Sequence, residues 1–182
     1  MLKEPPLPRV LVTANDTNGR SSFISDGPAH AVRTVAERPG YRVSNLWMTM
    51  DAPAPLEDPD RIDELKGLAP PPKGSLLRVI DYPPEPKDPL ERDRMFAAMF
   101  EKLFPDGRHL PENPPHPGMH ATTTLDYVIC LYGEIYAVMD SGEKLMRAGD
   151  ILIQRGTPHA WSNRSNDFAR IAFILMDGAR AK

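Results

Sequence analysis

Three side chains in the last third of the chain could form a reactive centre: His120, Asp126 and His159. They lie on segments that are expected to be β-strands, in which side chains alternate between two faces. If those strands are neighbours in a closed barrel, two imidazoles and one carboxylate converge inside it. This donor set suits Fe, Zn, Mn or Ni and leaves coordination positions open for substrate or water. The pattern therefore predicts a metal site made of His120, Asp126 and His159.

Each of these residues also has a simpler interpretation. Either histidine can be a hydrogen-bonded, metal-free residue at the mouth of a barrel. Asp126 can be a turn residue, or it can accept a hydrogen bond from His120 and orient that ring. His116 lies four residues before His120 with the same strand parity and is a candidate replacement ligand, although it stands between Pro115 and Pro117. The pattern does not identify a catalytic residue.

The composition limits the class of partner. The chain has 182 residues, a formal net charge of -3 and no run of Lys or Arg, which argues against nucleic acid or an anionic membrane as a partner. No apolar run is long enough to cross a bilayer, and the first residues lack the apolar region of a signal peptide. The single cysteine, Cys130, excludes an internal disulfide. We therefore expect a soluble, cytoplasmic protein whose ligand is a small molecule.

The strands that must position the candidate residues are short and separated by turns. From residue 119 onward, β-prone runs alternate with turns rich in Gly, Asp and Asn, which is typical of an all-β sandwich or barrel. The expected strands there cover 119–124, 126–132, 134–139, 144–147, 150–154, 158–163 and 168–175. Earlier in the chain, the sequence predicts a hairpin from 9–13 and 21–25, and strands at 42–50 and 75–82.

Proline and apolar spacing shape the rest of the N-terminal half. Prolines cluster at 53–59, 70–72, 83–89 and 111–117, where they disfavour long helices and central strands. A short helix is expected within 58–68. The one convincing helix spans 89–104, because its apolar residues fall on one stripe that is expected to pack on the domain: Leu90, Met95, Phe96, Met99, Phe100 and Leu103.

The segment from His120 to Asn163 resembles the two motifs of the cupin superfamily. The first motif reads His-x-His-x3-4-Glu-x6-Gly, and this chain has His120-x-Thr122-x3-Asp126-x6-Gly133. The second reads Gly-x5-Pro-x-Gly-x2-His-x3-Asn, and this chain has Gly149 followed by Gln154-x-Gly156-x2-His159-x3-Asn163. Threonine thus replaces the second histidine, aspartate replaces the glutamate, and glutamine replaces the proline.

The resemblance implies an all-β fold: a cupin-type jelly-roll β-barrel with an irregular, Pro-rich N-terminal arm and one short helix. We expect a single structural domain in which residues 1–110 (hairpin, strands, loops and the helix at 89–104) pack on a barrel core at 111–178. It also implies a homodimer, because cupin barrels commonly pair through exchanged strands, and an unpaired hairpin edge would risk aggregation. The ligand set is at most His120, Asp126 and His159.

Two hypotheses of function follow. The first is a small-molecule enzyme with a divalent metal in the barrel, for which isomerisation, dehydration, decarboxylation and dioxygenation are not distinguished. The alternative is a metal-free small-molecule-binding barrel, either without catalysis or with histidine acid–base chemistry. Its pocket is expected to be lined by five residues: Thr122, Val128, Cys130, Gln154 and Trp161. Whether the protein is an enzyme stays open at this point.

Overall fold

The computed structural model describes residues 3–104 and 113–180. Its elements are β1 (Arg9–Asn15), β2 (Ser21–Pro28), β3 (Ala31–Thr34), β4 (Arg42–Thr49), a single 3-10 turn (Ile62–Glu64), β5 (Ser75–Tyr82), α1 (Pro89–Leu103), β6 (Thr124–Tyr132), β7 (Glu134–Met139), β8 (Gly142–Arg147), β9 (Ile151–Arg155), β10 (His159–Ser162) and β11 (Ala169–Asp177).

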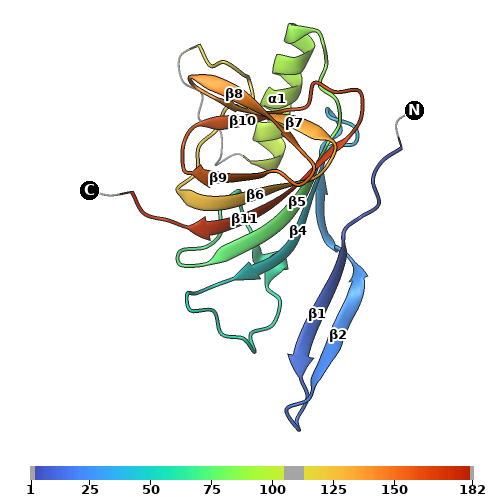
Figure 1. Ribbon diagram of the computed structural model, residues 1–182, viewed down its shortest axis with the longest axis vertical. Coiled ribbons are helices and arrows are strands. Elements are labelled where there is room, and N and C mark those ends of the chain that lie inside the picture. The colour runs from blue at the N-terminus through green and yellow to red at the C-terminus, as the bar shows by residue number, and fades with distance from the viewer. Residues whose placement is uncertain (1–2, 105–112, 181–182) are drawn as a thin grey trace.

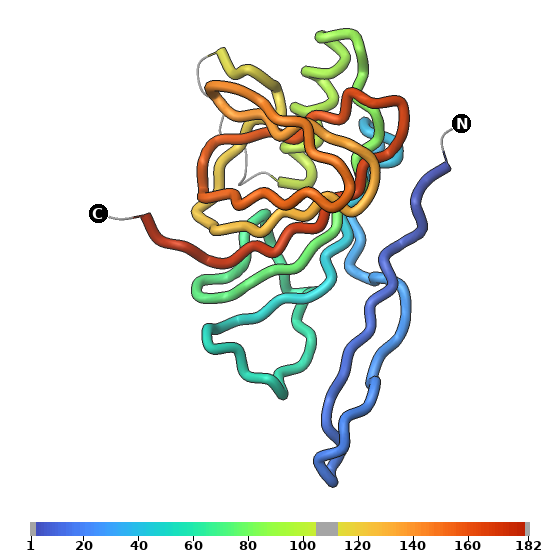
Figure 2. Tube along the Cα trace, viewed as in Figure 1, coloured from blue at the N-terminus to red at the C-terminus, as the bar shows by residue number. Residues whose placement is uncertain are grey.

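All the strand pairs are antiparallel and form two facing sheets and a hairpin. The larger sheet has the order β3-β4-β5-β11-β6-β9, and the smaller sheet has the order β10-β7-β8. The hairpin β1-β2 pairs with no other strand of the described residues and extends away from the body (Figure 1). Figure 2 shows the chain entering this hairpin along the outside of the body. The arrangement is the expected all-β jelly roll with one α-helix.

Three of the strands before residue 110 belong to the barrel. β3, β4 and β5 make up half of the larger sheet, and β5 pairs along its length with β11 from the C-terminal end of the chain. The larger sheet therefore contains strands from both expected parts, whereas residues 1–110 were expected to pack on a barrel core formed by 111–178. The expected boundary itself falls within 105–112, outside the described residues.

Strand alternation decides which side chains face the core. In β6 the residues Asp126, Val128 and Cys130 are buried, whereas Tyr127 between them is exposed. The main hydrophobic cluster joins both sheets and α1 in one continuous core. Gly133 permits the tight turn from β6 to β7, because its φ is 70° and an added Cβ would lie 2.2 Å from the carbonyl oxygen of Phe168.

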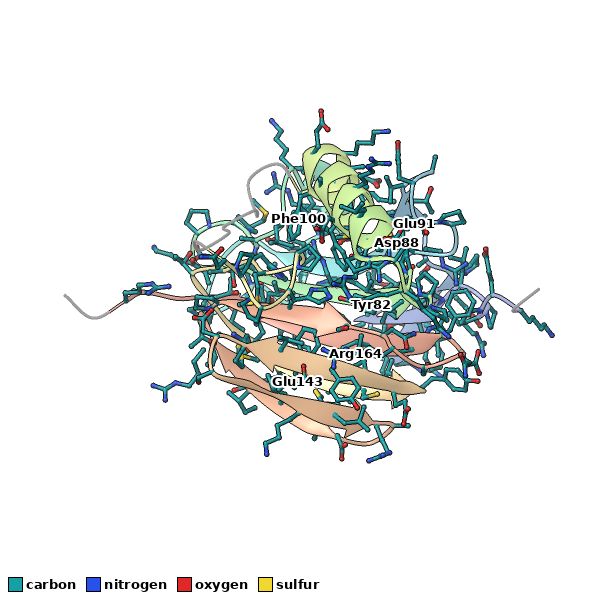
Figure 3. The ribbon with its side chains drawn as sticks, turned by 90° about the horizontal axis from the view of Figure 1, so that it is seen from above. Tyr82, Asp88, Glu91, Phe100, Glu143 and Arg164 are labelled. Carbon is teal, nitrogen blue, oxygen red and sulfur yellow. The ribbon has the colours of Figure 1, made fainter. Side chains whose placement is uncertain are left out.

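The helix at 89–104 is confirmed. Asp88 caps it by accepting a hydrogen bond from the backbone N–H of Leu90, and Pro89 occupies the first turn, where no donor is lost. Five of the six stripe residues are buried against the core, and Leu90 is the exception at 66% exposed. In Figure 3, α1 with Phe100 lies at the opposite end of the view from Glu143 of β8, and Tyr82 of β5 lies between them.

Two expected elements differ from the structure. The helix expected within 58–68 is only the 3-10 turn Ile62–Glu64, because the neighbouring prolines leave too few residues for helical hydrogen bonds. The strand expected at 119–124 is reduced to one isolated bridge, between His120 and His159. Within the described residues, no helix is both long and apolar enough to span a bilayer.

Candidate functional site

Two histidines face each other directly across the edge of the smaller sheet. His120 and His159 form an antiparallel bridge in which each backbone N–H donates to the other residue's carbonyl oxygen at 2.9 Å. Directly opposed residues project their side chains to the same face. The imidazole rings consequently lie side by side, with centroids 4.3 Å apart, inside the barrel.

The backbone fixes the same tautomer in both rings. Nδ1 of His120 donates to the carbonyl oxygen of Gly118 at 3.0 Å, and Nδ1 of His159 donates to that of Thr157 at 2.9 Å. Since a carbonyl oxygen can only accept, the proton of each neutral ring resides on Nδ1. The lone pair of each Nε2 is thus available to a ligand, and no hydrogen bond of the described residues uses either Nε2.

Burial keeps both imidazoles uncharged at neutral pH. Desolvation lowers the pKa of His159 to about 3, and the neighbouring His120 lowers it further than the hydrogen bond to Thr157 raises it. Desolvation also lowers the pKa of His120, with a smaller opposing effect from its bond to Gly118. The pair is therefore a set of two neutral hydrogen-bond acceptors.

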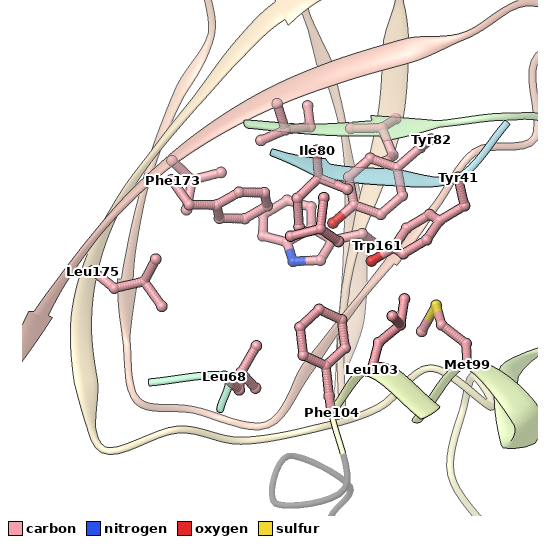
Figure 4. Close-up of a cluster of buried hydrophobic side chains, with 14 of the residues drawn as sticks. Tyr41, Leu68, Ile80, Tyr82, Met99, Leu103, Phe104, Trp161, Phe173 and Leu175 are labelled. Atoms are coloured by element: carbon pink, nitrogen blue, oxygen red, sulfur yellow. The ribbon is translucent and has the colours of Figure 1, made fainter. Parts of the chain in front are cut away.

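The imidazole pair opens into a cavity between α1 and the larger sheet. The cavity volume open to the centre of a water molecule is about 50 Å³, which is enough for a few waters or a small organic group. Figure 4 shows the apolar part of its wall, with Trp161 lying between Tyr82 of the sheet and Phe104 beyond α1. Aromatic side chains dominate this wall: Tyr41, Tyr82, Phe96, Phe100, Phe104, Trp161 and Phe173.

Asp126 lines the same cavity from β6. Its side chain is buried, and its Oδ1 has no hydrogen-bond partner among the described residues. Desolvation raises the pKa of Asp126 to about 6, against smaller lowering effects from Thr124 and Arg78. A buried carboxyl with this pKa is ionised in most molecules at neutral pH and protonated in mild acid.

Two arginines that sequence reasoning missed also line the cavity. Arg38 lies in the turn after β3, Arg78 lies in the middle of β5, and each side chain is only 2% exposed. Arg78 shares one face of β5 with Leu76 and Ile80, because the three occupy alternate positions of the strand. A charged residue on an otherwise apolar face is a usable sequence signal for an inward-pointing charge. Arg38 lies in an irregular turn, where no periodicity marks the direction of a side chain.

The five residues that were expected to line the pocket divide into two groups. Thr122 and Trp161 line the cavity. Val128, Cys130 and Gln154 are buried but do not line it, so the prediction is not met for these three. Val128 and Cys130 belong to the hydrophobic core, and the amide of Gln154 donates to the carbonyl and hydroxyl oxygens of Thr157.

His116 is engaged elsewhere. Its Nε2 lies 3.2 Å from Oε2 of Glu85, and its Nδ1 accepts a hydrogen bond from the backbone N–H of Gly118 at 3.0 Å. The ring is buried outside the cavity wall, against Phe96. It therefore does not substitute for the imidazole that Thr122 replaces.

The described residues do not complete a three-donor metal site. The free Nε2 atoms suit a metal ion, but no group of three His, Cys, Asp or Glu side chains within 3–104 and 113–180 could hold one. Catalytic metal centres usually have three protein ligands. At the position of the missing histidine, the hydroxyl of Thr122 is hydrogen-bonded to that of Thr124 at 2.7 Å.

Sequence comparisons find relatives in fungal biosynthesis. The chain is 29% identical to the Phomopsin biosynthesis cluster protein C' from Diaporthe leptostromiformis. The alignment covers 96% of this chain and 82% of that protein. It is also 29% identical to the cupin-domain-containing oxidoreductase fogC from Aspergillus ruber, in an alignment that covers 91% of this chain and 70% of that protein. No family model matches the chain.

Among solved structures, the cupin domain of Cnp3 from Schizosaccharomyces pombe aligns with a TM-score of 0.44 and 10% identity, covering 93% of this chain and 87% of that domain. The relatives named as cupin-domain proteins match 91% of the chain. The chain resembles cupin-domain proteins in sequence, and its antiparallel strands form the jelly roll that this resemblance implies.

Proposed function

We propose that the protein is a small-molecule enzyme that transfers protons in the cavity beside His120 and His159. The observation that carries the proposal is the pair of neutral imidazoles with both Nε2 lone pairs free in one largely apolar cavity. The relatives support an enzyme of small-molecule metabolism, because they are named for biosynthesis clusters or as oxidoreductases.

The chemistry follows from the two free lone pairs. A substrate C–H next to a carbonyl group can lose its proton to Nε2 of one ring, which becomes an imidazolium. The second ring, whose centroid lies 4.3 Å away, can accept a hydrogen bond from that imidazolium or from the substrate. Return of the proton to another substrate atom would give an isomerisation. If the imidazolium first exchanges its N–H proton with solvent, delivery of the solvent-derived proton to the original carbon would give hydrogen exchange.

Solvent exchange offers a test that needs no knowledge of the natural substrate. The purified protein is incubated in D2O with a panel of small ketones and keto acids, and deuterium incorporation is followed by NMR. We expect incorporation above the buffer rate for at least one compound, with a loss of about 100-fold in His120→Ala and His159→Ala, the usual scale for an acid–base residue. His30→Ala is the matched control, since His30 is exposed and lies outside the cavity wall.

Two outcomes would contradict the proposal. One is no exchange above buffer for any compound in the panel. The other is exchange that both cavity variants retain at the wild-type rate, because the bases would then lie elsewhere.

A second candidate is a divalent-metal enzyme, and the free Nε2 atoms favour it. It ranks behind proton transfer because the described residues lack a third donor group. A bound metal would act as a Lewis acid. Melting curves with Fe(II), Zn(II), Mn(II) or Ni(II), and with EDTA, separate the two candidates. A metal-dependent rise in Tm that His159→Ala abolishes would favour the metal enzyme.

A further inference from the structure

We propose that the cavity binds the carboxylate group of a small apolar or aromatic molecule through the guanidinium groups of Arg38 and Arg78. The proposal names the substrate class for the enzyme proposed above and in that sense rests on it. Binding can nevertheless be measured without any reaction.

Arg78 holds an incompletely paired charge in the middle of the larger sheet. It lies on β5, between Asn45 of β4 and Phe173 of β11, and is 2% exposed. Its Nε donates to Oδ1 of Asn45 at 3.1 Å, but neither Nη1 nor Nη2 has a partner among the described residues. Unpaired buried donors on a charged group destabilise the fold, because the group has lost its hydration without gaining acceptors. Such a cost is understandable if a ligand supplies the missing acceptors.

Arg38, which also lines the cavity, presents the same pattern. Its carbon Cζ lies 4.6 Å from the ring centroid of Tyr41 and 4.8 Å from that of Phe96. Nη1 makes only a weak contact with the sulfur of Met99 at 3.6 Å, and Nε and Nη2 have no partner among the described residues. Cation–π contacts fix the plane of this guanidinium but leave its edge free to donate.

Among the residues that the structure describes, no carboxylate neutralises these two charges at contact distance. None of the ion pairs formed by residues 3–104 and 113–180 includes Arg38 or Arg78. Glu85 acts on Arg38 and Asp126 acts on Arg78 only through longer-range attraction. Burial lowers the pKa of Arg78 to about 10, so the group stays protonated at neutral pH. The cavity therefore carries excess positive charge and free N–H donors.

The shape and lining of the cavity favour a carboxylate over other anions. A guanidinium presents parallel N–H groups that match the two oxygens of a carboxylate. The remaining wall is mainly aromatic, which suits an apolar body and disfavours a strongly hydrated phosphate. With about 50 Å³ available to water centres, only a small molecule fits without movement of the wall. The imidazoles of His120 and His159 line the same cavity and would face the rest of that molecule.

Calorimetry with charged and neutral probes of equal shape tests the proposal. Sodium benzoate is compared with benzamide, and sodium acetate with acetamide, at constant ionic strength on the full chain. We expect at least one carboxylate to bind and to raise Tm, while its amide does neither. Failure of both carboxylates to bind the wild-type chain at tens of millimolar would overturn the proposal, and this result does not depend on any variant.

Variants then assign the site. Arg38→Met and Arg78→Met are each expected to weaken carboxylate binding at least tenfold and to leave Tm without ligand unchanged or higher, because a desolvated charge is removed. Arg33→Gln is the matched control: Arg33 is a nearby cation that acts on Arg78 but does not line the cavity, so binding should be retained.

The alternative is that the two arginines serve only the packing of aromatic rings. A fall in Tm or loss of folding in the methionine variants, or carboxylate binding that they leave unchanged, would support that role and overturn the proposal. Carboxylate binding without deuterium exchange would leave this inference standing and contradict the proton-transfer function. Deuterium exchange without carboxylate binding would support the proton-transfer function and contradict this inference.

Discussion

At the scale of single residues, the cavity combines groups whose protonation states are set by burial. The imidazoles of His120 and His159 are neutral because burial lowers the pKa of both rings, and the charge of Arg78 adds to this effect at His120. The hydroxyl of Tyr82 stays protonated because desolvation raises its pKa well above the ordinary value. The cations of the cavity are thus arginines, while the histidines remain acceptors.

Asp126 gives the stability of the protein a specific pH dependence. Because burial raises its pKa from 3.8 to about 6, the folded state holds this proton more tightly than the unfolded state. The stability from this group is fully present below about pH 4 and is lost as the pH rises through 6. We therefore expect Asp126→Asn to raise the free energy of unfolding by on the order of 2–3 kcal/mol at pH 7 and by close to zero at pH 4.

Urea denaturation of both proteins between pH 4 and pH 8 measures this difference. Asp140→Asn, an exposed turn variant, controls for the loss of one carboxylate and should show no such trend. A gain for Asp126→Asn that does not change with pH would mean that ionisation of Asp126 is not what limits stability.

The sequence predicts the imidazole pair but not the arginines, for a physical reason. His120 and His159 stand at motif positions and oppose each other in one antiparallel bridge, which directs both side chains to the same face. Asp126 is directed inward by strand alternation in β6 and reaches the cavity. The direction of Arg38 depends on a turn and on the rings that it contacts, so it is set by tertiary packing that a single sequence does not display.

At the scale of elements, β5 links the interior of the barrel to its outside. Arg78 points into the cavity, while Asp81 on the same strand accepts hydrogen bonds from Arg42 of β4 and Arg170 of β11. The same two arginines also donate to the backbone carbonyls of Pro5 and Pro6. One carboxylate therefore ties three neighbouring strands to the N-terminal arm.

Removal of that carboxylate should be costly. Asp81 is 1% exposed, and Asp81→Ala leaves two largely buried guanidiniums without their anion. We expect a loss of about 3–5 kcal/mol in the free energy of unfolding, measured by urea denaturation. Asp26→Ala is the matched control, because its bidentate pair with Arg9 is exposed and screened by solvent, so its loss should change stability far less. Equal losses in the two variants would show that burial does not govern these pairs.

Element types and positions are largely predictable here, and the failures have local causes. Long strands and the helix at 89–104 carry strong periodicity, and the expected strand at 134–139 coincides with β7. The segment 119–124 has strand-forming residues, but it pairs with β10 at one residue pair, His120 and His159. It therefore forms an isolated bridge and no continuous strand. Propensity cannot reveal how many partners a segment will find.

At the scale of the whole molecule, the hairpin β1-β2 is the most exposed structure. It pairs with no other strand in the described chain and carries large apolar side chains that are mostly open to solvent: Leu11 at 49%, Phe23 at 71% and Ile24 at 64% exposed (Figure 1). Such an edge invites pairing with another chain. We propose that it mediates a homodimer.

Light scattering after size exclusion tests the dimer. The wild-type chain is expected to elute with twice the mass of the 20.3 kDa polypeptide at micromolar concentration. Phe23→Lys and Ile24→Glu are expected to give the single-chain mass while preserving the circular dichroism of the barrel. Tyr127→Lys, on the exposed outer face of β6, is a control for the loss of a surface aromatic. A wild-type mass of one chain would rule the dimer out.

The two kinds of cavity group come from separate stretches of the polypeptide. Arg38 and Arg78 precede α1, whereas His120, Asp126 and His159 follow it. A protein that shares the C-terminal stretch can therefore keep the imidazole pair and still carry a differently charged wall. The two proposals together predict that exchange of residues 35–82 between relatives changes which compound is bound and leaves the imidazole pair in place, which makes this stretch the natural target for redirecting the protein.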